Sequence, residues 1–145
     1  YKTIFDESVI NIMVYNMETI IAEKFEAVLS KNIENTRMKD YYDLYVFSTL
    51  KWNVVDKVLL KKAIYNTCNK RNSINYLNNS GEYISLVAND NKMKGLWERY
   101  QNNYSYAKNI TFEDTIDAIN KINDLLLESE WNCVHFSCIL NIYLL

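Results

Sequence analysis

The sequence predicts a mainly helical α+β protein, in which an N-terminal strand or short β-ribbon precedes a bundle of about five to six helices. Its 145 residues fit a single domain, 1–145, which can bury about two-thirds of the surface that the unfolded chain exposes. Apolar residues make up 49% of the chain, which excludes a disordered segment. There are only two glycines and no proline, so helices joined by polar loops are favoured over a sheet with many tight turns.

The N-terminal region alternates in the way that a β-strand does. In SVINIMVY, residues 8–15, the even positions from Ile10 to Val14 are all aliphatic, which gives a period of two. The segment KTIF, residues 2–5, would pair with it across Asp6-Glu7. Because two strands alone are marginally stable, we expect them to join a larger sheet or to lie against helices.

From Asn16 the apolar residues recur at helical spacing, which predicts a first helix over 16–31 and a polar loop over 32–36. Further helices are expected over 37–50, over 53–70 with Asn53 as N-cap, and around 82–90 and 92–104. The intervening segment RNSINYLNNSG, 71–81, is an Asn- and Ser-rich connection. Thr111 and Asp114 resemble a capping box at the start of a last helix that ends near Glu128.

Charge and cysteine content limit the class of protein. A formal net charge of −2 provides no overall positive field for nucleic acid, so any RNA or nucleotide contact has to be local. Three cysteines without a disulfide-framework spacing favour the reducing cytoplasm. The apolar tail, 131–145, is shorter than the roughly 20 residues that span a bilayer, so no membrane anchor is expected.

Several charged residues fall on the apolar faces of the first two helices. On a helical wheel Asp40 and Asp43 share an arc of about 120° with apolar residues, and Asp43 lies near its middle. Lys24 and Lys31 lie on one line of the first helix, about 20° apart. Because helices joined by a short loop usually pack antiparallel, these two lines are expected to meet. Arg37, and Lys39 with it, add positive charge at the start of the second helix.

The wheel geometry allows two interpretations. In the first, an ion pair such as Lys24 with Asp43 fixes the register of two helices and has only a structural role. In the second, the lysines contact successive phosphates of a nucleotide, while Asp43 holds a lysine in place or acts on an acceptor hydroxyl. The geometry alone favours the structural ion pair.

The segment YNMETIIAEKFEAVLSKNIENTRMKDYYDLYVF, 15–47, closely resembles the third and fourth motifs of the AbiEii/AbiGii family of nucleotidyltransferase-like toxins. The family pattern is a helix reading A-E-K-x-x-A-x-x-x-R, followed by R-x-[KR]-D-x-x-D. The first motif is matched by Ala22, Glu23, Lys24 and Ala27. The second is matched by Arg37, Lys39, Asp40 and Asp43. Lys31 stands where the family has Arg, which keeps the charge but not the planar fork that grips phosphate.

The resemblance implies a polymerase-β-like nucleotidyltransferase active in toxin–antitoxin or phage-defence systems. It implies Asp43, Lys24 and Asp40 as catalytic residues, and Lys24, Lys31, Arg37 and Lys39 as nucleotide-binding residues. NTP and Mg²⁺ are the implied substrate and cofactor, RNA or tRNA is the expected acceptor, and a cognate antitoxin is an expected partner. The family's upstream glycine loop and D-x-D metal pair have no counterpart, since Gly81 and Gly95 follow the motifs. We therefore expect the C-terminal part of such a toxin, without metal ligands and inactive alone.

An alternative from a different class of protein remains open. The chain would then be a non-catalytic helical module that binds RNA or the cognate antitoxin. In this interpretation the charged helix pair serves only as a structural clasp.

Overall fold

The computed structural model describes residues 17–128, which form seven α-helices and two short 3-10 helices. In chain order these are α2 (Met17–Lys31), η1 (Asn32–Glu34), α3 (Met38–Thr49), α4 (Lys57–Lys70), α5 (Ile74–Asn78), α6 (Ser80–Asn89), α7 (Asn91–Asn103), η2 (Ser105–Ala107) and α8 (Phe112–Leu127). None of these helices combines the length and apolar composition that a membrane-spanning helix needs.

The predicted α+β class is wrong for the part of the chain that the structure describes, because residues 17–128 contain no strand. The physical reason is the apolar period. Alternation with a period of two occurs only in the segments 2–5 and 8–15, and from Met17 onward apolar residues recur every three or four positions. Both predicted strands lie outside the described residues, as does the apolar tail 131–145.

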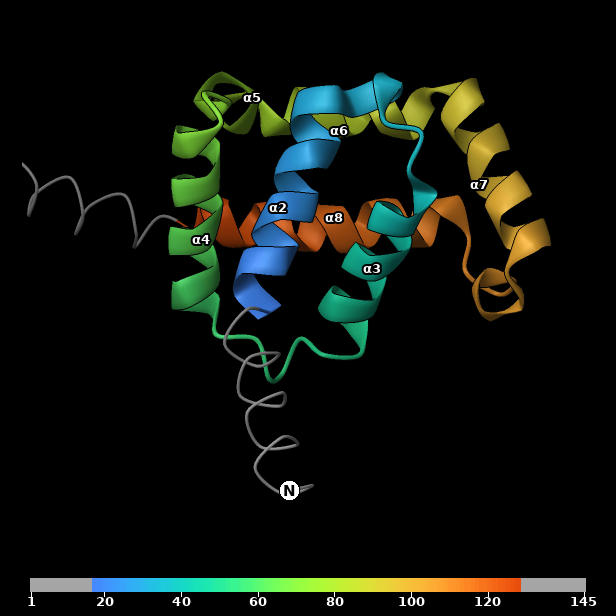
Figure 1. The fold of residues 1–145 in the computed structure, drawn as a ribbon, viewed down its shortest axis with the longest axis horizontal. Coiled ribbons are helices and arrows are strands. Elements are labelled where there is room, and N and C mark those ends of the chain that lie inside the picture. Colours follow the sequence, from blue (N-terminus) through green and yellow to red (C-terminus); the bar gives the residue numbers. More distant parts are fainter. Residues whose placement is uncertain (1–16, 129–145) are drawn as a thin grey trace, which may run out of the picture.

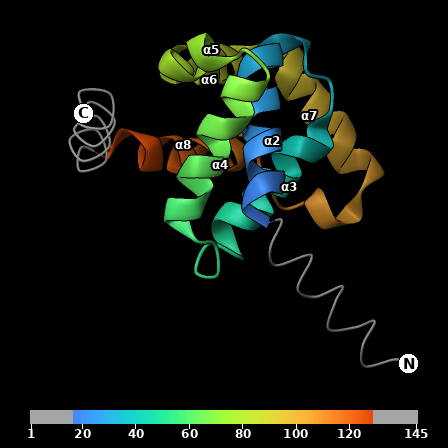
Figure 2. The same cartoon turned by 60° about the vertical axis from the view of Figure 1, so that its left-hand side comes forward.

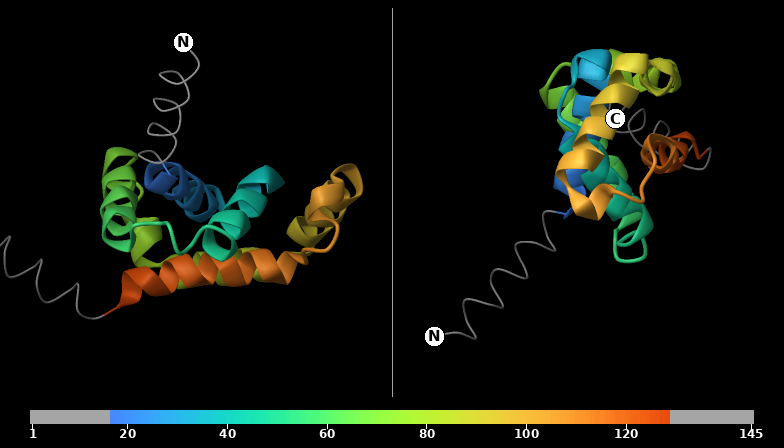
Figure 3. Two further views of the ribbon diagram at one scale, coloured as in Figure 1. Left: turned by 90° about the horizontal axis from the view of Figure 1, so that it is seen from below. Right: turned by 90° about the vertical axis from the view of Figure 1, so that its right-hand side faces the viewer.

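Helices α4, α2 and α3 form a layer that packs against the long helix α8. α2 lies between α4 and α3, and the three run side by side (Figure 1). α5 and α6 lie across one end of this layer, and α7 lies beyond α3 (Figures 1 and 2). Seen from below, α8 forms a base against which α3 packs closely (Figure 3). Every α-helix contributes side chains to one continuous hydrophobic cluster.

The start of α4 differs from the predicted one. Asn53 is exposed and caps nothing, and the helix begins at Lys57, where the Asp56 carboxylate accepts a hydrogen bond of 3.0 Å from the Leu59 amide. The buried Glu18 carboxylate of α2 accepts the Asp56 amide at 2.9 Å. Asp56 is therefore held from both sides, and this tertiary contact selects it over Asn53 as the cap.

The predicted connection at 71–81 contains the short helix α5 and the start of α6. Its apolar residues Ile74 and Leu77 are three apart, and Leu77 is buried in the core. Ser80 donates a hydrogen bond of 2.6 Å to the Asn123 side chain of α8. Packing on neighbouring helices thus orders a segment whose composition favours a loop.

The capping box at the start of α8 is confirmed. The Asp114 amide donates to the Thr111 hydroxyl at 3.0 Å, and the Thr111 amide donates to the Asp114 carboxylate at 2.8 Å. Just before it, the Trp97 indole of α7 donates to the Ile110 carbonyl at 2.9 Å. The last residues of the α7–α8 connection are therefore held both by α7 and by α8.

We expect Thr111→Ala to lower the free energy of unfolding by about 1 kcal/mol, because it leaves the Asp114 amide without its cap. Urea denaturation of the full chain measures this loss. Thr111→Ser, which keeps the hydroxyl, serves as the control and should retain most of the stability. Equal stability of Thr111→Ala and the wild type would contradict the role given to the capping box.

Candidate functional site

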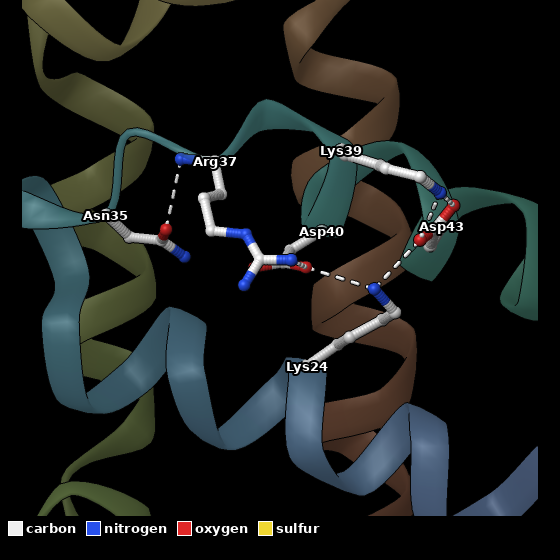
Figure 4. Close-up of polar contacts among 6 residues, drawn as sticks. All are labelled: Lys24, Asn35, Arg37, Lys39, Asp40 and Asp43. Atoms are coloured by element: carbon white, nitrogen blue, oxygen red, sulfur yellow. Dashed lines mark hydrogen bonds and ion pairs between the residues drawn. The ribbon is translucent and has the colours of Figure 1, made fainter.

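The reversal of the chain between α2 and α3 brings Lys24 to the two aspartates of α3. Lys24 Nζ lies 3.0 Å from Asp40 Oδ1 and 2.8 Å from Asp43 Oδ2 (Figure 4). The predicted contact of the Lys24 line with the Asp40 and Asp43 line is therefore present. One ammonium group joins two carboxylates that lie one turn apart on the facing helix.

Two further cations lie on the outer side of the cluster. Lys39 Nζ donates to the two Asp43 oxygens at 3.1 and 3.0 Å. Arg37 Nη2 lies 3.8 Å from Asp40 Oδ1, beyond ordinary hydrogen-bond distance. We refer to Lys24, Arg37, Lys39, Asp40 and Asp43 as the charged cluster. It holds three cations against two carboxylates.

Exposure divides the charged cluster into an inner and an outer part. The Asp40 and Asp43 side chains are 6% and 17% exposed, and that of Lys24 is 19% exposed. The side chains of Lys39 and Arg37 are 63% and 69% exposed. We expected Asp43 near the middle of the apolar arc, but at 100° per residue the middle falls at Phe47, and Asp40 lies nearer to it than Asp43 does, in agreement with the deeper burial of Asp40. The negative charge is thus internal, and the cations face outward.

Asn35 fixes the end of the α2–α3 connection just before Arg37. From the sequence, no role was predicted for this residue beyond the polar loop 32–36. Its side-chain oxygen accepts the Arg37 amide at 3.1 Å, which is an Asx turn leading into α3. Asn35 is buried, and its side-chain nitrogen has no hydrogen-bond partner among the described residues. The sequence does contain a signal for this Asx turn, because Asn35 stands two positions before Arg37, the first residue of the R-x-K-D motif.

Next to Asp40 in the sequence, Tyr41 belongs to an aromatic pair in the hydrophobic core. Tyr41 is fully buried, and its ring packs against that of Phe112 in α8, with centroids 6.0 Å apart. Burial raises the pKa of the Tyr41 phenol, and the charge of Asp40 raises it further. Tyr41 therefore stays neutral. It belongs to the hydrophobic core and not to the charged cluster.

The protonation state of Lys24 is set by two opposing effects. Burial lowers the pKa of its ammonium group, but the hydrogen bonds to Asp43 and Asp40 and their negative charges outweigh burial, so the pKa is raised from its ordinary value of 10.5. Lys24 is consequently a fixed positive charge at neutral pH. It is suited to binding an anion and not to accepting a proton.

Lys31 does not join the charged cluster. It is exposed at the last turn of α2 and forms no ion pair with any of residues 17–128. Its azimuth agrees with that of Lys24, but α3 begins only at Met38, after η1 and a loop, and of the two lysines only Lys24 pairs with the aspartates.

The charged cluster does not fit a divalent metal ion. Lys24 already spans Asp40 and Asp43, and within residues 17–128 no group of three His, Cys, Asp or Glu side chains could hold a metal. Its outward cations are instead suited to an anion such as phosphate.

One known protein family matches the part of the chain that contains the charged cluster. The sequence model of a family described as Nucleotidyl transferase AbiEii toxin, Type IV TA system, matches residues 1–118. This span contains the whole charged cluster and ends within α8. No curated protein and no solved structure matches the chain significantly.

Replacing Lys24 by methionine should lower the free energy of unfolding by about 2–4 kcal/mol, because two nearly buried carboxylates would lose their shared counter-charge. Lys39→Met is the matched control. It removes an exposed ammonium from the same Asp43 and should cost less than about 0.5 kcal/mol. Equal losses in urea denaturation for the two variants would contradict the division into inner and outer parts.

The raised pKa of Lys24 predicts how its contribution depends on pH. A group whose pKa rises on folding stabilises the protein fully below its unfolded pKa, and this stabilisation is lost as the pH rises through the folded value. The stability difference between wild type and Lys24→Met should therefore be constant from about pH 7 to about pH 9. It should shrink above the ordinary value of 10.5. A difference that already shrinks between neutral pH and that value would show that Lys24 is not held as a cation by the aspartates.

Proposed function

Because the chain belongs to the AbiEii family of nucleotidyl transferase toxins of type IV toxin–antitoxin systems, we propose that the charged cluster is the nucleotide-binding part of a transferase site. The reaction would transfer a nucleotide from NTP to an acceptor hydroxyl, with RNA or tRNA as the acceptor. The observation that carries this proposal is the convergence of Lys24, Asp40 and Asp43 at the positions of the family motifs.

Each charge has a proposed task. Lys24, joined by Arg37 and Lys39 at the exposed edge, would bind the phosphates of the nucleotide. Arg37 is suited to the outermost phosphate, since its guanidinium group is the most exposed of the three and only weakly engaged by Asp40. Lys31 is exposed and unpaired within the described part, so it would contribute at longer range from the end of α2.

The proposed chemistry uses the carboxylates for orientation. The acceptor oxygen attacks the α-phosphorus, a new P–O bond forms, and the bond to the β-phosphate breaks to release pyrophosphate. Asp43 would accept a hydrogen bond from the acceptor hydroxyl and take up its proton. Asp40 would hold Lys24 in position from its more buried place. No step of this proposal passes through a metal ion.

In the cell, such a transferase would act in the cytoplasm as a toxin in phage defence, with a cognate antitoxin opposing it. The non-catalytic alternative, a helical module that binds RNA or the antitoxin, is favoured by one observation. The Lys24 ammonium is already engaged by both aspartates, as a structural clasp would require. The two proposals differ in whether the folded protein incorporates nucleotide.

We expect Asp43→Asn in the full-length protein to reduce incorporation of labelled nucleotide into RNA by at least about a hundredfold, because the amide cannot take up the proton. Lys24→Ala should abolish incorporation through loss of phosphate binding. Asp117→Asn, an exposed change on the outer face of α8, is the matched control and should leave incorporation unchanged.

Circular dichroism decides between the two proposals. Folded but inactive Asp43→Asn and Lys24→Ala proteins support the transferase. Unfolding of both variants, or no incorporation by the folded wild type, would favour the non-catalytic clasp. Full activity of Asp43→Asn would contradict the proton-accepting role of Asp43.

A further inference from the structure

An open cleft of about 300 Å³ adjoins the charged cluster, between the start of α3 and the second half of α7. Arg37 and Lys39 line one side of it, and Arg99, Tyr100 and Tyr104 line the other. Its volume is at the lower end of the roughly 300–1,000 Å³ of small-molecule sites, which suits a single nucleotide unit. Arg37 and Lys39 belong to both the cleft and the charged cluster, so the two are continuous.

The positive charge of the cleft is available to a ligand. Arg99 is exposed and forms no ion pair within the described part of the chain. Arg37 reaches Asp40 only at 3.8 Å, and Lys39 is largely exposed even though it contacts Asp43. Cations from two separate elements thus face one space, as phosphate recognition requires.

A tyrosine surface forms the α7 side of the cleft. The rings of Tyr100 and Tyr104 have centroids 4.7 Å apart, and Tyr104 is 45% exposed. The Tyr100 hydroxyl is 2.9 Å from that of Tyr106, whose ring packs against Tyr42 of α3 at 4.7 Å. Tyr100 therefore packs against Tyr42 of α3, with ring centroids 6.3 Å apart, as well as against Tyr104.

The tyrosine surface and the charged cluster also interact electrostatically. Burial raises the pKa of the Tyr100 hydroxyl, the hydrogen bond to Tyr106 raises it further, and the charge of Asp43 contributes in the same direction. Tyr100 is therefore a neutral phenol close to the proposed reactive carboxylate. A base stacked on Tyr104 would lie beside the site where transfer is proposed.

We propose that this cleft binds one nucleotide unit, with its base stacked on Tyr104 and its phosphate on Arg99, next to the NTP phosphate that Arg37 would bind. Aromatic stacking inside a positive groove is the usual means of binding a single-stranded nucleic acid without reading its sequence. The unit would be the terminal nucleotide of the acceptor strand, because the cleft is open and a strand can leave it. This assignment to the acceptor rests on the proposed function, whereas binding itself does not.

The test measures two probes with the full-length protein. Fluorescence anisotropy follows a short labelled single-stranded RNA, and calorimetry follows each NTP. Tyr104→Ala and Arg99→Gln should each weaken binding of the RNA by about tenfold. Tyr104→Phe keeps the stacking ring and should bind within about twofold of the wild type. Lys92→Gln removes an exposed cation from the first turn of α7, outside the cleft, and should bind like the wild type.

A loss confined to the RNA probe assigns the cleft to the acceptor strand. A loss confined to NTP keeps the nucleotide site but assigns it to the donor. Wild-type binding of both probes by Tyr104→Ala and Arg99→Gln would overturn the proposal, as would an equal loss in Lys92→Gln.

Nucleotide incorporation separates the failure of this inference from the failure of the proposed function. If Asp43→Asn is inactive while the cleft variants behave like the wild type, only the cleft proposal fails. If the folded wild type incorporates no nucleotide while Tyr104→Ala weakens RNA binding, only the transferase proposal fails. If Asp43→Asn is as active as the wild type, only the role proposed for Asp43 fails.

Discussion

The arrangement of α2 and α3 depends on one ammonium group between two carboxylates. Asp40 and Asp43 lie on the same side of α3 and are almost enclosed by protein, so burial of their charges is unfavourable unless a cation compensates them. That cation comes from the facing helix. Lys24 therefore fixes the relative position of the two helices more narrowly than apolar packing does, because a shift of one turn would leave a charge unpaired.

The same arrangement decides which charges remain available. With the carboxylates engaged on the inside, the guanidinium and ammonium groups of Arg37 and Lys39 face outward, and Asn35 sets the direction in which the chain enters α3. The tyrosines at the end of α7 complete a wall opposite these cations. A structural ion pair and the proposed anion-binding surface are thus two aspects of one cluster. This is why wheel geometry alone favoured the structural interpretation and the family motifs favoured the nucleotide.

Features with a strong local signal could be predicted from the sequence. The contact of Lys24 with Asp40 and Asp43 follows from helical periodicity and a short connection, and the capping box at Thr111 follows from local chemistry. Features set by tertiary contacts could not. The α4 cap needed Glu18. A helical wheel shows azimuth only, so it could not show that Lys24 pairs with the aspartates and Lys31 does not.

The tyrosine surface and the fold class also could not be predicted correctly from the sequence. Tyr100 is far in sequence from both Tyr42 and Asp43, so its packing against Tyr42 and its electrostatic interaction with Asp43 appear only in three dimensions. The α+β class came from alternation confined to residues outside the described part, and the class was extended from there to the whole chain. Within residues 17–128 apolar residues recur at helical spacing, and all the regular elements are helices.

The most direct test of the account is whether a nucleotide contacts the Lys24 ammonium group. Nitrogen-15-edited NMR can follow the lysine ammonium signals of the full-length protein during NTP titration, with the Lys24 signal assigned by its absence in Lys24→Arg. The account predicts a saturable shift of the Lys24 signal, which Arg37→Gln moves to higher NTP concentration. A Lys24 signal that stays unchanged at NTP concentrations supporting nucleotide incorporation would contradict it.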